Sequence, residues 1–74
     1  MVPPKTDPRW GKLIGNLENT PVTHLVTKML ITRLKLLMTW EKTEAKKQEA
    51  ITAAYDFFVK NENSVKDDIK LIFG

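Results

Sequence analysis

The chain of 74 residues contains no cysteine, so it can form no disulfide and offers no thiolate ligand to a structural metal. Its single histidine, His24, has no second metal-ligating residue near it, which argues against a structural zinc site. A chain this short buries a small share of its surface and is marginally stable without disulfides, a metal or oligomerisation. We therefore expect oligomerisation or a partner to supply the missing stability, with no metal and no cofactor.

Helix-breaking residues are also scarce. No proline follows Pro21, and no glycine lies between Gly15 and Gly74. This absence, together with apolar residues at helical spacing, predicts an all-α protein. We expect a small bundle of three to four helices built around a central apolar helix at about 21–40, a second helix at about 43–60 and a short C-terminal helix at about 64–73.

The central helix is unusually apolar. Thr20 is suited to its N-cap and Pro21 to its first position. On a helical wheel the apolar residues cover roughly two thirds of the circumference, far more than the roughly 100° stripe of an ordinary surface helix. Lys28, Arg33 and Lys35 interrupt the segment, and no apolar run in it exceeds three residues, so we do not expect it to span a membrane.

A break between the first two long helices is expected near residues 39–43. Thr43 followed by Glu44 is typical of an N-cap with an acidic first turn. The apolar face also rotates by roughly a quarter turn across this region. The alternative is one helix of about 40 residues, about 60 Å long, which would make the molecule elongated and oligomeric. In the second helix, Ala50 and Ala54 would allow close approach to the first.

The two ends of the chain carry their own helix signals. Asp7 followed by Pro8 predicts a helix start, and Gly15 predicts its end. Near the C-terminus, Ser64 and Asp67 have the spacing of a capping box and predict the start of the last helix.

The domain organisation follows from these signals. Residues 1–7, which include two prolines, are expected to form a flexible N-terminal arm, and residues 8–74 a single helical domain. Trp10 is expected either to fold back with its segment as a lid on the central helix or to stand exposed as an anchor for a partner.

The residues needed for catalysis are missing or isolated. The chain has no cysteine nucleophile, and its only serine, Ser64, is assigned to a helix cap. His24 lies on the polar side of the central helix without a group that would orient it as a general base. No dinucleotide-binding, phosphate-loop, zinc-protease or EF-hand pattern is present. We expect no enzymatic activity.

The wide apolar arc favours a protein–protein interaction module, such as an adaptor, regulator or accessory subunit, that also associates with itself. Two short helices of about ten residues and one longer one can leave part of the arc uncovered, and a large uncovered apolar patch usually marks a partner surface. The alternative is that the three neighbouring helices suffice and the monomer is complete. Arg33 lies in the middle of the apolar face and has three possible roles. It could rest its stem on apolar surface while its guanidinium reaches solvent or a carboxylate such as Asp56. It could instead lie at a protein interface, or bind an anion. The expected interface residues are Arg33, Trp40, Trp10 and Met29.

Nucleic-acid binding is the second interpretation. The net charge is +3, from 12 Lys and Arg against nine Asp and Glu, and acidic residues interrupt each basic run. Arginine, the commonest specific base reader, occurs only twice. The candidate contacts are Lys42, Lys46, Lys47, Lys5 and Arg9.

A third interpretation is a membrane-surface protein of the bacteriocin type, which the apolar helix and two tryptophans allow and the nine acidic residues oppose. No signal peptide or transmembrane segment is visible in the sequence, so we expect a cytoplasmic protein.

Overall fold

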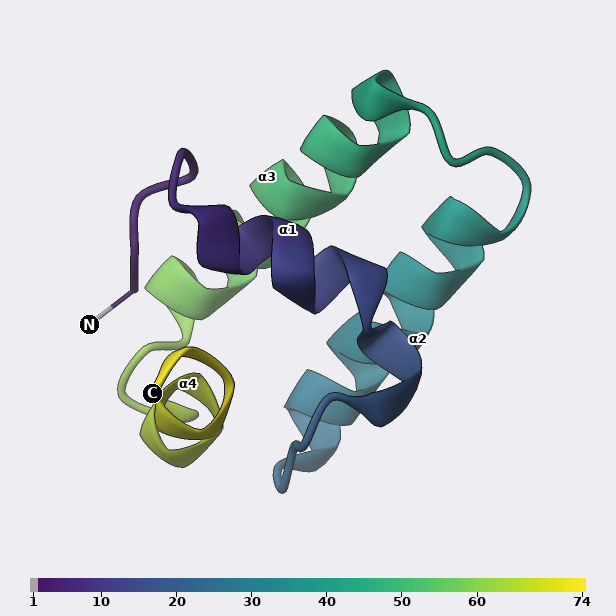
Figure 1. The fold of residues 1–74 in the computed structure, drawn as a ribbon. Helices are drawn as coiled ribbons and strands as arrows, with labels where there is room; N and C mark the ends of the chain where they lie inside the picture. Colours follow the sequence, from purple (N-terminus) through teal and green to yellow (C-terminus); the bar gives the residue numbers. More distant parts are fainter. Residues whose placement is uncertain (1) are drawn as a thin grey trace.

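The computed structural model describes residues 2–74 and, over that range, contains helices and no strands (Figure 1). In chain order the elements are α1 (Pro8–Gly15), the short 3-10 helix η1 (Leu17–Asn19), α2 (Leu25–Thr39), α3 (Glu44–Lys60) and α4 (Lys66–Phe73). The chain reverses between α2 and α3, which form a hairpin, and α1 crosses this hairpin (Figure 1). The predicted all-α bundle is confirmed, including the break before Thr43. None of the described helices combines the length and the apolarity that a membrane crossing requires.

Two helix starts lie where the sequence predicts them. The Asp7 carboxylate accepts a hydrogen bond from the Arg9 backbone N–H at 2.9 Å, and Pro8 occupies the first position of α1. The Thr43 hydroxyl accepts from the Lys46 backbone N–H at 3.2 Å at the start of α3. Each cap satisfies a backbone donor that has no partner inside the helix, and both signals are local in the sequence.

The start of α2 differs from the prediction, because Thr20 does not cap it. The Thr20 hydroxyl donates to the Asn16 carbonyl at 2.8 Å, so it belongs to the preceding turn. α2 begins only at Leu25, with His24 at the N-cap and no side-chain capping bond from that residue. Before it, the side chain of Asp68 in α4 accepts hydrogen bonds from the backbone N–H groups of Thr23 and His24.

The start of α4 differs as well. Ser64 does not cap it, because residues 61–64 form a turn in which the Ser64 N–H donates to the Asn61 carbonyl at 2.9 Å. α4 begins at Lys66, with Val65 at the N-cap and no side-chain capping bond.

The core is centred on Trp10, which is completely buried. Its ring centre lies 4.7 Å from that of Phe73, 6.1 Å from that of Phe58 and 6.0 Å from that of Tyr55. The indole N–H donates to the Pro3 carbonyl at 3.1 Å, which satisfies its one polar group. α1 therefore packs mainly on α3, and its Trp10 also contacts Phe73 of α4, whereas η1 contacts the central helix α2. Of the two alternatives for Trp10, the exposed anchor is wrong.

The segment ahead of α1 lies against this core. Pro3 is buried and Val2 packs on the buried cluster. The Asp7 N–H donates to the Pro4 carbonyl at 2.9 Å, and Lys5 Nζ lies 5.5 Å from the ring centre of Tyr55. The arm expected at residues 1–7 is thus, from residue 2 onward, held to the domain by these contacts; Met1 lies outside the described residues.

Candidate functional site

The central helix α2 has two apolar faces, and the protein buries only one of them. The inner face is formed by buried residues that contact the rest of the domain: Thr27, Leu30, Ile31 and Leu34. The outer face carries five large apolar side chains that are exposed: Leu25 (74%), Val26 (41%), Met29 (64%), Leu36 (64%) and Trp40 (90%). We call these five residues the α2 stripe.

The α2 stripe is continuous along the helix. From Val26 to Trp40 its line of residues advances in alternating steps of three and four, with Arg33 completing the series between Met29 and Leu36. This spacing keeps side chains on one line of a helix and is the spacing by which one helix packs along another. Taking about 150–250 Å² for a full side chain of this size, the stripe exposes on the order of 600 Å² of apolar surface, as large as the largest patches on typical monomers.

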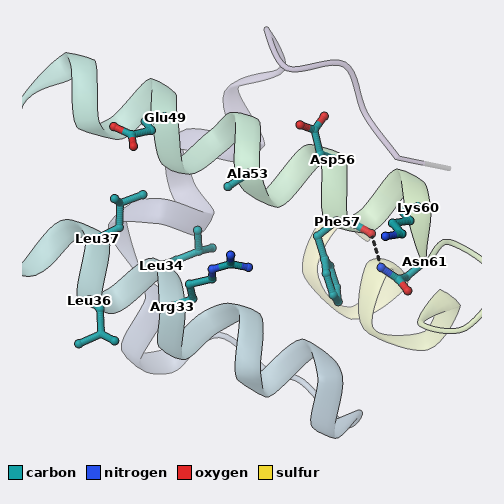
Figure 2. A pocket seen from close by; sticks show the side chains of 10 residues that line it. All are labelled: Arg33, Leu34, Leu36, Leu37, Glu49, Ala53, Asp56, Phe57, Lys60 and Asn61. Atoms are coloured by element: carbon teal, nitrogen blue, oxygen red, sulfur yellow. Dashed lines mark hydrogen bonds between the residues drawn. The ribbon is translucent and has the colours of Figure 1, made fainter.

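A groove of about 790 Å³ runs beside the α2 stripe, between α2 and α3 (Figure 2). Its α2 side carries Leu36, Leu37 and the exposed Arg33. Its α3 side carries Glu49 and Asp56, with the short side chain of Ala53 between them (Figure 2). Phe57, Lys60 and Asn61 complete the α3 side, so the groove has an apolar floor, a cation on its α2 side and both carboxylates and a cation on its α3 side.

Arg33 and Asp56 line this groove without pairing. Within residues 2–74, neither side chain forms a hydrogen bond or an ion pair, so the contact between them that the sequence suggested is absent. Glu49 does have a partner, because Lys46 Nζ lies 3.6 Å from its Oε2. Arg33 thus lies inside an exposed apolar line with its guanidinium unpaired.

Three of the four predicted interface residues, Arg33, Trp40 and Met29, lie on this outer face of α2. Trp10 does not, because it is completely buried and no partner could contact it without opening the core. The sequence missed Leu25, Val26 and Leu36 as members of the same face. Their shared angular position on a helical wheel was visible, but which of the two faces of α2 would be covered depends on tertiary packing.

The predicted nucleic-acid contacts are distributed over several places. Arg9 is engaged by the Asp7 carboxylate at 2.9 Å and by the Phe73 carbonyl at 2.6 Å, and the hydrogen bonds from Arg9 lower the pKa of Asp7 to about 2. Lys46 pairs with Glu49. The remaining three candidates line two separate hollows, one with Lys5 and Lys47 and the other with Lys42.

Asp68 is a buried polar residue whose role the sequence did not reveal. Its Oδ1 accepts from the Thr23 N–H at 2.6 Å and from the Thr23 hydroxyl at 2.8 Å, and its Oδ2 accepts from the His24 N–H at 3.0 Å. Burial raises the pKa of Asp68, but these hydrogen bonds outweigh burial and hold the pKa below its ordinary value. The carboxylate therefore acts as a cap for α2 supplied from α4, and it positions the helix that bears the stripe.

The described residues contain no cluster of three or more His, Cys, Asp and Glu side chains that could hold a metal ion. Comparisons with protein-family models, with curated proteins and with solved structures gave no match for this chain.

Proposed function

We propose that this protein is a small non-enzymatic protein–protein interaction module, such as an adaptor, regulator or accessory subunit, that docks through the α2 stripe. The observation that carries the proposal is the exposure of five large apolar side chains on one face of the central helix. Burying such a surface removes apolar area from water, which is the main driving force of most protein association.

The composition of the α2 stripe supports this function. Trp40, Met29 and Arg33 belong to the residue types that are enriched at protein interfaces. Trp40 is exposed by 90% at the end of α2, where a tryptophan contributes nothing to the core of the chain itself but could fill a pocket of a partner.

The proposal is tested by photo-crosslinking in the cells that make the protein. A benzoyl-phenylalanine introduced at Met29 or at Trp40 is expected to form adducts with a protein partner. The matched control is Leu71 on α4, which is also a large exposed apolar residue (51% exposed) and lies outside the stripe. Equal labelling from all three positions, or no adduct from the two stripe positions, would refute the assignment.

Nucleic-acid binding gains no specific support from the geometry, and membrane-surface binding, which the exposed apolar face of α2 also allows, stays a prediction. Two of the five basic candidates are paired with acidic side chains, and the other three line two hollows. We therefore do not extend the proposal to them, and the cytoplasmic location expected from the sequence stays a prediction.

A further inference from the structure

We propose that the occupant of the α2 stripe is a second copy of this chain, placed by a two-fold axis so that Arg33 of each copy pairs with Asp56 of the other. The inference rests on the proposed function, because it uses the same surface, and it adds the identity of the partner and the polar contact that selects it.

The apolar part of the surface is complementary to itself. The same alternating steps of three and four occur on both copies, so two α2 helices can interlock their side chains along the stripe. In a two-fold interface the same patch is used on both subunits. The stripe offers on the order of 600 Å² of the roughly 800 Å² per partner that a standard stable interface buries, and the groove residues beside it supply the remainder.

The charges identify the partner. Covering the α2 stripe also covers Arg33, and burying a guanidinium without a partner is strongly unfavourable. A purely apolar partner would therefore bind poorly, whereas a partner with a carboxylate facing Arg33 would bind well. The chain carries such a carboxylate on the opposite side of the same groove, in Asp56, whose side chain is unpaired within the described residues.

Asp56 is a better candidate than the other acid of the groove. The Glu49 carboxylate is already 3.6 Å from Lys46 Nζ, whereas Asp56 forms no ion pair within residues 2–74, although Lys60, one turn further along α3, lines the same groove. The groove of about 790 Å³ leaves space for an incoming side chain, and the small Ala53 between the two acids keeps that space open. Because the interface is two-fold, one complementary pair is formed twice.

The test is a charge exchange followed by light scattering of the full chain. Arg33→Glu alone and Asp56→Arg alone each place like charges opposite one another in the dimer, and each is expected to raise the dissociation constant by at least about tenfold. Mixing the two variants in equal amounts is expected to restore the dimer. In the mixed pair, the introduced glutamate of one copy meets the introduced arginine of the other, and the unchanged Arg33 and Asp56 meet at the second, symmetry-related contact.

The control for charge alone is Lys28→Glu, which makes the same change of charge on the exposed polar side of α2 and is expected to leave the mass unchanged. Circular dichroism of each variant shows whether the helices are retained. An equal mixture of the two variants that stays monomeric would overturn the pairing, and so would an Arg33→Glu chain that dimerises like the original.

The outcomes separate this inference from the proposed function. A chain that is monomeric at every concentration, but whose position 40 still crosslinks to a different protein, would overturn the second copy as occupant and leave the interaction module standing. A dimer that survives both charge variants but is lost on Met29→Lys would keep the stripe as the self-docking surface and overturn the contact between Arg33 and Asp56.

Discussion

The polar residue with the greatest structural effect in this protein is Asp68, a completely buried carboxylate. Its partners, Thr23 and His24, precede it by 45 and 44 residues. Local capping signals such as Asp7 and Thr43 could be predicted because donor and acceptor are two or three residues apart. A cap supplied from a different helix leaves no such spacing in the sequence, and this is why the start of α2 was placed too early.

Asp68→Asn should lower the free energy of unfolding by about 2–4 kcal/mol, because an amide nitrogen would replace one charged acceptor and leave a partly buried N–H of Thr23 or His24 without its partner. Urea unfolding at neutral pH measures this. Asp67→Asn, the exposed neighbour in the same helical turn, is the control and should cost less than about 1 kcal/mol. Similar losses for the two variants would show that the Asp68 hydrogen bonds do not stabilise the fold.

The same carboxylate also makes stability depend on pH. The pKa of Asp68 is lowered on folding from 3.8, so its contribution is fully present above the unfolded-state value and is lost as the pH falls through the folded-state value. Below pH ~4 the original chain should therefore lose stability more steeply than Asp68→Asn. Asp7, whose pKa is about 2, is present in both chains, so its contribution to the pH dependence of stability cancels in this comparison.

At the scale of elements, α2 and α3 form a hairpin, so only the face of α2 that lies toward the rest of the domain is buried. Ala50 and Ala54 are completely buried on α3, which packs on both α2 and α1. The sequence predicted both the break between these helices and these small residues, because the signals are local. It predicted an uncovered apolar surface but not its limits, since these depend on where α1 and η1 pack.

Ala54→Phe should unfold the protein or lower its free energy of unfolding by at least about 1–3 kcal/mol, because a large side chain in a close-packed interior forces its neighbours apart. Thermal unfolding followed by circular dichroism measures this. Ala45→Phe, at an exposed position of the same helix, is the control and should change the midpoint little. An unchanged melting curve for Ala54→Phe would contradict the close packing of α3 in the core.

At the scale of the whole molecule, the chain has no cysteine and can form no disulfide, and one buried apolar cluster holds its helices together. The buried cluster around Trp10 joins α1, α3 and α4 and covers one face of α2. The other face has no counterpart within residues 2–74. Length and composition alone favour a partner for so small a domain. The exposed face of α2 is the surface on which we propose that this partner binds.

The most direct measurement is the solution mass of the unmodified chain by light scattering, at two protein and two salt concentrations, beside Met29→Lys. The account predicts that the original chain reaches twice its single-chain mass of 8.5 kDa as its concentration rises, and that Met29→Lys stays at the single-chain mass. A single-chain mass for the original protein at every concentration, or a dimer that Met29→Lys leaves intact, would contradict it.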